Sequence, residues 1–261
     1  MEKVCLANVL DGTFKCNDTQ QGTDEYFNRY TFATFAHLCD DSPLVLTLND
    51  EDFALLKRDV TVGLNVKPEN VQKLSIYEAI RQYSDSHQTN GFFVKVADAS
   101  PKDTRGIESQ KHAMTPLRSP EDLWTALTNS KRVRTFVTYH QGRCDMVLRP
   151  WNNTITRDNE YRVFVFNQRA RAISQQHLYT QVNQLFTADQ LTKAVDDWLM
   201  FNILPEKDAV LDVYFDNNCA MHLIECNPAW FGSGAALFTW DELKRIAESD
   251  DMTVKVRCIS D

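Results

Sequence analysis

The chain has 261 residues, of which 43% are hydrophobic and 11% aromatic. This apolar content suffices for one large domain or two smaller lobes and excludes an intrinsically disordered chain. The net charge of −8 disfavours nonspecific binding to nucleic acid, because proteins that bind the phosphate backbone are usually basic. A local basic pocket for a nucleotide is compatible with this charge.

The seven cysteines are odd in number and form no CxxC pair, which disfavours both a disulfide scaffold and a zinc site. No apolar run reaches the length of a signal-peptide core or of a membrane span. We therefore expect a reducing, cytoplasmic environment, either in the cell that makes the protein or in a host cell that receives it.

Helical patterns dominate residues 1–90. Three helices are predicted there, at residues 24–39, 50–57 and 75–83. Ser75 and Glu78 have the spacing of a capping box at the start of the third helix. Between the second and third helices, residues 60–66 predict short or irregular structure. We expect residues 1–90 to form a helical N-terminal region.

The middle of the chain has more β patterns. Residues 91–97 predict a strand, and residues 123–128 predict a helix that Ser119 caps and Pro120 opens. Four β-rich runs follow, at residues 134–139, 146–149, 161–166 and 171–175.

The last third of the chain predicts a β-hairpin between two helices. The helices are at residues 187–201 and 240–247, and the strands at 209–215 and 221–226. Asp216, Asn217 and Asn218 form a strong turn sequence between the strands. This order indicates an α+β fold with a largely antiparallel sheet. We expect a first lobe at residues 91–140 and a second at 141–261, although no linker marks the boundary.

Lys95 lies inside the apolar strand sequence FFVKV. A buried isolated charge costs several kcal/mol, so such a lysine meets a partner or a ligand, or its ammonium group reaches solvent. Two interpretations therefore stay open for Lys95: a lysine of an edge strand, or a phosphate ligand.

Asp212 and Glu225 lie inside the two strands of the predicted hairpin. A two-residue or a four-residue loop puts both carboxylates on the same face, opposite or diagonal to each other, about 5–8 Å apart. Two close carboxylates repel each other unless one is protonated or a cation bridges them. Asn227 points to the same side if the strand continues. These oxygen ligands suit Mg²⁺ together with a substrate phosphate, and the alternative is a solvated acidic face without metal.

Arg149 and Arg162 also lie in β-rich sequences. Each is a plausible fork for a phosphate, or equally a structural partner of an acid such as Glu160. The chain has no GxxxxGK[ST] loop, and Gly232 to Leu237 do not form a dinucleotide-binding fingerprint. A bound nucleotide would therefore be held by strands and their side chains.

Six blocks of sequence, in order between residues 91 and 243, resemble the cell-division-cycle protein 123 (D123) family. The blocks are VK at 94–95 with ASPKD at 99–103, MVLRPW at 146–151, EYRVFV at 160–165, ISQQ at 173–176, DVY at 212–214 with LIECNP at 223–228, and ALFTWDEL at 236–243. Residues 1–90 contain no such block.

The resemblance implies an ATP-grasp fold that binds ATP and Mg²⁺ between two lobes. It implies that Lys95, Arg149 and Arg162 contact the nucleotide and its phosphates. Metal ligation would fall to Asp212, Glu225 and Asn227, and adenine would pack against an inter-lobe hinge within residues 137–148, which include Val147.

The chain departs from the family pattern at several places. Glu225 replaces the usual aspartate, Gln176 replaces an arginine, and residues 229–234 are less polar than in eukaryotic members. The sequence stops at Asp261, whereas eukaryotic members have a longer tail that engages the γ subunit of translation initiation factor 2. We expect the nucleotide site to be retained, and the assembly role depends on whether that tail is needed.

The resemblance leaves three functions open. The first is an ATP-dependent assembly chaperone for eukaryotic translation initiation factor 2, with its γ subunit or another protein as partner. The second is an ATP-dependent ligase that joins a carboxylate, activated as an acyl phosphate, to an amine. The third is a non-catalytic scaffold that needs the nucleotide. His177, Tyr179 and His222 are candidates for substrate contacts, although histidines are more often solvated or structural.

Overall fold

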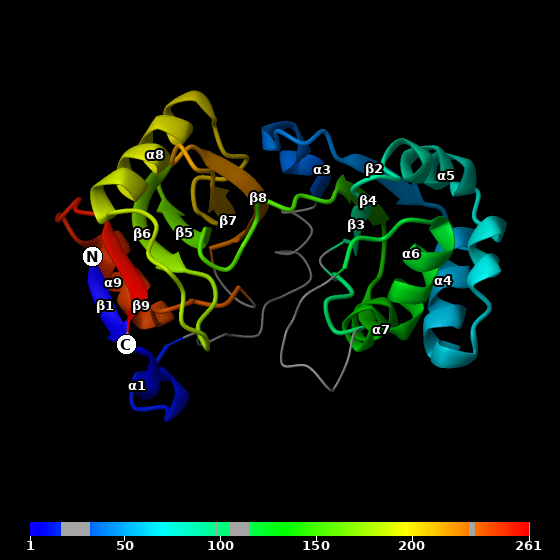
Figure 1. Cartoon of the computed structure of the whole chain (residues 1–261), viewed down its shortest axis with the longest axis horizontal. Coiled ribbons are helices and arrows are strands. Elements are labelled where there is room, and N and C mark those ends of the chain that lie inside the picture. The colour runs from blue at the N-terminus through cyan, green and yellow to red at the C-terminus, as the bar shows by residue number, and fades with distance from the viewer. Residues whose placement is uncertain (17–31, 98, 105–114, 230–232, 261) are drawn as a thin grey trace. The chain divides into compact units, whose positions relative to one another are not determined.

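The computed structural model describes residues 1–16, 32–97, 99–104, 115–229 and 233–260. The chain divides into two compact units. Unit 1 comprises Met1–Tyr30, His37–Asp40 and Asn153–Asp261, and unit 2 comprises Thr31–Ala36 and Asp41–Asn152. Each unit has its own sheet and helices (Figure 1).

Unit 2 contains a three-stranded antiparallel sheet in the order β2-β4-β3. Its strands are β2 (Leu44–Leu48), β3 (Phe92–Val96) and β4 (Cys144–Pro150). Its longer helices are α4 (Asp50–Val62), α5 (Tyr77–Ser86), α6 (Pro120–Asn129) and α7 (Lys131–Tyr139). Alternate strand residues such as Val94 and Leu148 join Trp124, Leu127 and Val133 of the helices in one core, so the helices cover one face of the sheet.

Two expectations for the helices of unit 2 need correction. Helix α4 continues to Val62, and the short 3₁₀ helix Gly63–Asn65 follows it, so most of 60–66 is regular. Helix α5 begins at Tyr77 without a side-chain cap. Ser75 instead donates its hydroxyl to the buried Asp52 at 2.5 Å.

The β-rich run at 134–139 is helical, as part of α7. Ser130 caps this helix by accepting a hydrogen bond from Val133 N at 3.1 Å. Val133 and Val137, four residues apart, lie on the buried face of the helix. Tertiary packing therefore overrides the β preference of the valines and threonines in this stretch.

Only the end of the predicted helix at 24–39 falls within the described residues. There, α3 (Phe32–Phe35) and the 3₁₀ helix Ala36–Leu38 are helical. Residues 24–31 lie outside the described part of the chain.

Unit 1 contains a six-stranded sheet in the order β1-β9-β6-β5-β7-β8. The strands are β1 (Glu2–Cys5), β5 (Glu160–Phe166), β6 (Arg169–Gln175), β7 (Ala209–Phe215), β8 (Met221–Pro228) and β9 (Lys255–Ser260). The four strands β5 to β8 are antiparallel as expected, whereas β9 runs parallel to β1 and β6. Sequence patterns did not predict β1, β2 or β9.

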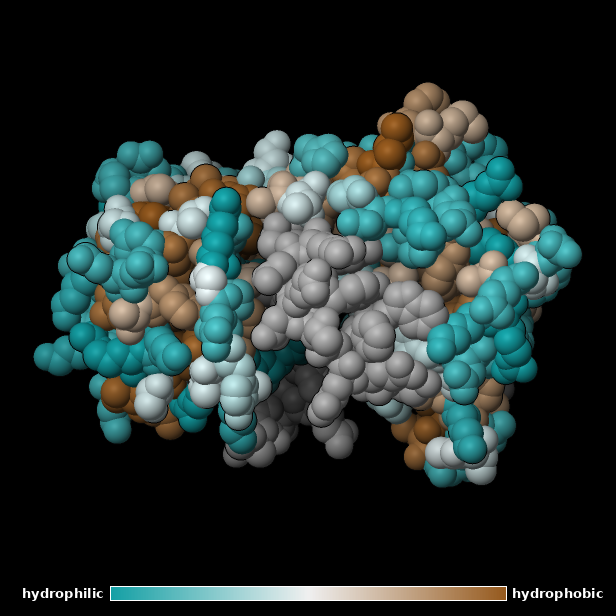
Figure 2. Space-filling model, turned by 180° about the vertical axis from the view of Figure 1, so that it is seen from behind, coloured by the Kyte–Doolittle hydropathy of each residue, from teal (hydrophilic) through white to brown (hydrophobic). Residues whose placement is uncertain are grey.

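Two layers cover the sheet of unit 1. Helix α8 (Ala188–Phe201) packs against β6 and β8. On the opposite face, α1 (Leu6–Leu10), α9 (Trp240–Glu248) and residues 233–239 contribute to a separate core with Phe164, Ala172 and Val210. Helix α8 appears clearly at the top of this unit in Figure 1. The surface seen in Figure 2 is largely polar, with hydrophobic side chains gathered in places.

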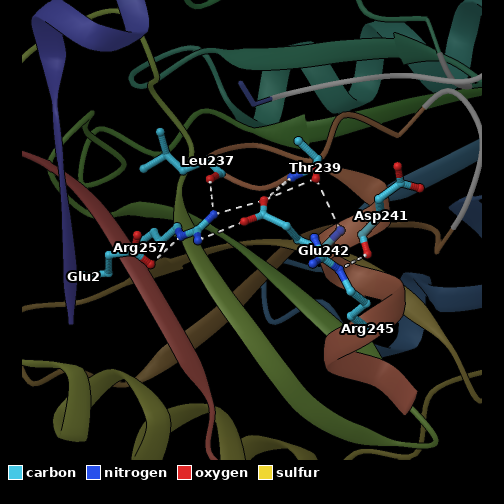
Figure 3. A network of polar contacts seen from close by, with 7 residues as sticks. All are labelled: Glu2, Leu237, Thr239, Asp241, Glu242, Arg245 and Arg257. Atoms are coloured by element: carbon cyan, nitrogen blue, oxygen red, sulfur yellow. Dashed lines mark hydrogen bonds and ion pairs between the residues drawn. The ribbon is translucent and has the colours of Figure 1, made fainter. Parts of the chain in front are cut away.

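A polar network ties the start of α9 to β9 (Figure 3). Arg257 of β9 donates hydrogen bonds to Glu2, to Glu242 and to the Leu237 carbonyl. Glu242 also forms a capping box with Thr239. Burial alone would raise the pKa of Glu242, but the hydrogen bonds from Arg257 and Thr239 outweigh it and hold that pKa below its ordinary value.

The sequence-based division at residues 90 and 140 does not coincide with the two units. Residues 41–90 belong to the same unit as 91–140. Strand β4 lies after residue 140, yet it is the central strand of the unit 2 sheet. Within the described ranges, no helix is long and apolar enough to cross a membrane.

Candidate nucleotide site

A row of polar side chains crosses the sheet of unit 1. Directly paired residues in neighbouring strands point to the same face of a sheet. The pairs Glu225–Asp212, Asp212–Arg162, Arg162–Ser174 and Ser174–Arg257 therefore align five side chains across five strands. This charged row shares its face with Asn227, which pairs with Val210.

A β-bulge at Ile224 brings Glu225 into this row. Near the turn, Val213 pairs with Leu223, but the next pair is Asp212 with Glu225, so Ile224 is the extra residue. If the strands paired without a bulge, Ile224 would lie opposite Asp212, and Glu225 would point to the other face of the sheet. The prediction that Asp212 and Glu225 share a face is confirmed. They pair directly, which was one of the two arrangements expected, but the bulge that produces this pairing was not expected.

Arg162 holds Asp212 with a two-pronged ion pair. Its Nε lies 2.7 Å from Asp212 Oδ1 and its Nη2 lies 2.9 Å from Oδ2. Its Nη1 also donates to the Gly234 carbonyl at 2.7 Å. Burial alone would lower the pKa of Arg162, but the charge and hydrogen bonds of Asp212 outweigh it, so that pKa is raised. Three of the five N–H groups are thus used, and two can still donate to a ligand.

The neighbourhood of Asp212 is suited to a hard cation. Asn227 Nδ2 donates a long hydrogen bond of 3.5 Å to Asp212 Oδ2, and Asp212 Oδ1 keeps a lone pair beyond its bond to Arg162. Burial and then the negative charges of Glu225 and Asp212 raise the pKa of Cys226 to about 12, so its thiol stays protonated. Two carboxylates and a carboxamide fit Mg²⁺ better than zinc. Among the residues that the structure describes, no three His, Cys, Asp or Glu side chains cluster as a metal cage.

The cationic residues predicted at the nucleotide lie together on unit 2. Lys95 pairs with Val147, and Phe93 pairs with Arg149, so Lys95, Val147 and Arg149 share the sheet face that does not carry the helix core. Lys95 and Arg149 are diagonal neighbours, a spacing of about 7–8 Å between Cα atoms. Two cations this close suit a polyphosphate.

Arg149 already has a carboxylate partner. Its Nε and Nη2 donate to the two oxygens of Asp41 at 2.7 and 2.9 Å. Its guanidinium also lies 5.6 Å from the centre of the Phe32 ring. A phosphate bound at Arg149 would therefore share this guanidinium with Asp41 or displace the Asp41 carboxylate from it. No sequence signal pointed to Asp41, which lies 108 residues away in the chain.

The histidines named as candidate substrate contacts differ in their environments. His177 lies 2.8 Å from Glu160, and His222 lies 2.6 Å from Asp40 and stacks on Tyr214. Glu160, Tyr214 and His222 form the next row of the same sheet face. Tyr179 is exposed, so its side chain is accessible to a partner.

The seven predicted site residues form two sets. Unit 1 carries Arg162, Asp212, Glu225 and Asn227, and unit 2 carries Lys95, Val147 and Arg149. Within each set the side chains share one face of a sheet. Sequence reasoning missed Ser174 and Arg257 in the charged row. Ser174 follows the apolar residues Ala172 and Ile173 within a β-rich run, which was a usable signal.

The two sheet-containing units form the predicted α+β ATP-grasp fold, and a solved structure shares this fold. The structure of Cdc123 from Schizosaccharomyces pombe matches with a TM-score of 0.71 over 93% of this chain and 100% of that chain, at 20% identity. Residues 65–261 match the D123 family, and the chain belongs to that family. The match begins upstream of residue 91 and so includes part of the region in which no resembling block was found.

Curated relatives match a shorter stretch. The translation initiation factor eIF2 assembly protein of Xenopus tropicalis is 34% identical over 106 residues, which are 39% of this chain and 31% of that protein. Cell division cycle protein 123 of Candida glabrata is 30% identical over 123 residues, 45% of this chain and 34% of that protein. The matched stretches thus span about a third of the length of these relatives.

Proposed function

We propose that this chain binds ATP with Mg²⁺ and uses the bound nucleotide to assist assembly of translation initiation factor 2. The observation that carries the nucleotide part is the charged row of unit 1, where an arginine fork orients Asp212 beside Glu225 and Asn227. In this proposal the three oxygen-bearing side chains hold Mg²⁺. The metal neutralises phosphate charge when bound.

Lys95, Arg149 and Arg162 take the phosphates in this proposal. Lys95 and Arg149 offer two cations on one sheet face of unit 2, and Arg162 has two N–H groups left after its bonds to Asp212 and Gly234. Val147 lies opposite Lys95 in the ladder and is the apolar residue proposed to lie near the adenine ring.

The assembly part of the proposal rests on the family to which the chain belongs. The chain belongs to the D123 family, and matching curated relatives carry the name of eIF2 assembly proteins. The γ subunit of that factor is the first partner to test. A cytoplasmic location is part of the same proposal, because initiation factors work in that compartment.

A ligase remains the second candidate because of one specific contact. His177 Nε2 lies 2.8 Å from Glu160, one row from Arg162 on the same face of the sheet. A carboxylate that fixes a histidine tautomer is a common arrangement for a general base. Such a base could deprotonate an amine that attacks an acyl phosphate.

Equilibrium titration of ATP, with and without Mg²⁺, tests the nucleotide site. We expect Asp212→Asn to lower the affinity for ATP in Mg²⁺ by at least about tenfold, equivalent to ~1.4 kcal/mol. Asp250→Asn, which changes an exposed acid of the same unit, serves as the matched control. Equal affinity of the wild type and Asp212→Asn would refute the site.

Product analysis separates the two functions. An assembly factor retains ATP, and its binding to the purified γ subunit depends on nucleotide. A ligase that works through an acyl phosphate releases ADP and inorganic phosphate when an amine and a carboxylate are supplied, and His177→Gln abolishes that release without weakening ATP binding.

A further inference from the structure

The end of helix α8 exposes an unusual group of apolar side chains. Met200, Phe201 and Ile203 are 72%, 83% and 82% exposed, whereas Leu191 and Val195 of the same helix are fully buried. Hydrophobic side chains of this kind appear in brown and tan along the top of the unit that contains α8 (Figure 2). Contiguous exposed apolar groups mark interaction sites, in contrast to single ones.

A cavity of about 350 Å³ lies beside these residues. Its lining consists of Gln168, Arg169, Ala170, Asp196, Leu199, Met200, Met252 and Val254, so it holds one basic and one acidic side chain. Met252 is itself 48% exposed, so two exposed methionines contribute to the lining. Methionine side chains adapt to the shape of a bound group, and this volume accommodates a large apolar side chain.

Helix α8 itself carries more acidic than basic side chains. Its acids are Asp189, Asp196 and Asp197, and its base is Lys193. Lys193 and Lys255 already pair with Asp197 at 2.6 Å and Asp251 at 2.8 Å. Asp196, which lines the cavity, has no ion-pair partner within the described ranges.

Asp196 experiences this excess of negative charge. Partial burial and then the neighbouring Asp197 raise the pKa of Asp196 above its ordinary value. A basic group placed beside Asp196 would favour its charged form and so lower this pKa. An anionic membrane is a poor occupant for the same reason, because peripheral membrane sites are usually basic.

We propose that the α8 surface docks a protein segment that inserts a large apolar side chain into the cavity and places a basic residue next to Asp196. An amphipathic helix with lysine or arginine along its polar edge has this chemistry. The surface lies entirely on unit 1, and the proposal does not depend on nucleotide binding.

The methionines of the chain provide a direct test. Two helical peptides of about five turns are compared, with the same leucine face and either lysine or glutamate on the polar face. Methyl resonances of methionine are followed by NMR in the full chain. The lysine peptide should shift the signals of Met200 and Met252 and leave that of the buried Met146 unchanged.

Two matched variants locate the binding. Phe201→Asp should weaken the lysine peptide by at least about tenfold, as expected for an anchor residue of an interface. Leu64→Asp replaces an equally exposed apolar residue in unit 2, 87% exposed, and should change nothing. Asp196→Lys should reverse the preference between the two peptides. ATP affinity should be the same in all three variants.

Several results would overturn the proposal. These are no shift at Met200 and Met252, equal effects of Phe201→Asp and Leu64→Asp, or equal binding of the two peptides. Binding to anionic phospholipid vesicles that Phe201→Asp abolishes would assign the surface to a membrane instead. Circular dichroism of each variant checks that the exposed substitutions leave the fold intact.

Discussion

The two sheets hold their charged residues in different ways. In unit 1, Asp212 and Arg162 are direct neighbours in the β-ladder and neutralise each other. In unit 2, Arg149 is neutralised by Asp41, which lies outside the sheet just before β2. In unit 1 both members of the ion pair therefore lie in paired strands, whereas in unit 2 the carboxylate that pairs with Arg149 lies in a connecting segment. Charge on a sheet is tolerated in both cases only because a partner accompanies it.

Arg162→Met should cause the largest loss of stability among the substitutions that test this difference between the two sheets. It leaves Asp212, whose side chain is 10% exposed, without its fork. Removal of one partner of a buried ion pair lowers the free energy of unfolding by about 3–5 kcal/mol. Urea denaturation followed by circular dichroism measures the loss. Arg157→Met, which replaces an exposed arginine of the same unit, is the control. A similarly small loss of stability in both variants would show that the ion pair between Arg162 and Asp212 contributes little to the fold.

Arg257→Met tests the far end of the same row. The variant loses the hydrogen bonds to Glu2, Glu242 and the Leu237 carbonyl, and its stacking 4.3 Å from the Phe238 ring. We expect a loss of about 2 kcal/mol, typical of hydrogen bonds to a charged group. Hydrogen exchange should locate the loosening in α9 and residues 233–239. Exchange that increases uniformly over unit 1 would argue against a local anchor.

Asp41→Asn should have a smaller effect in unit 2. Asp41 is 30% exposed, so the pair with Arg149 is screened and its removal should lower the free energy of unfolding by about 1 kcal/mol. Hydrogen exchange at β4 and at Phe32–Phe35 should increase, while that of unit 1 stays the same. If Asp41→Asn lowered the free energy of unfolding as much as Arg162→Met does, the two ion pairs would contribute equally to stability, contrary to this prediction.

The parts of the site that sequence could predict depend on local patterns. The hairpin β7–β8 was recognised from its turn, and a charge inside an apolar strand marked Lys95, Asp212 and Glu225. The bulge at Ile224 has no such signal, because it is set by how two strands pack. The face of Glu225 was predicted, and its direct pairing with Asp212 was one of the two registers considered, but the bulge was not predicted.

The parts that failed depend on distant contacts. Strands β1 and β9 are short and pair across the whole length of the chain. Strand β2 pairs with β4 across about a hundred residues, which is why no linker marked the units. Helix α7 was misread because its valines and threonines favour strands, although Ser130 offered a cap signal.

Each unit holds one capping carboxylate whose protonation in acid should destabilise the fold. Burial alone would raise the pKa values of Glu242 in unit 1 and Asp103 in unit 2, but hydrogen bonds hold both below their ordinary values. Asp103 receives bonds from Ser130 and from the first backbone N–H groups of α7. A carboxylate with a lowered folded-state pKa stabilises the fold above its unfolded pKa, and this stability is lost as pH falls through the folded value.

Glu242→Gln and Asp103→Asn should therefore each reduce the dependence of stability on pH below about 4.5, where ordinary carboxyls titrate. Thermal unfolding measured at a series of pH values gives this slope for each variant and for the wild type. Glu242→Gln should flatten the slope mainly in α9 and Asp103→Asn mainly in α7, as reported by hydrogen exchange. If neither variant changes the slope, these carboxylates titrate alike in the folded and unfolded chains, and the caps act through hydrogen bonds that do not depend on charge.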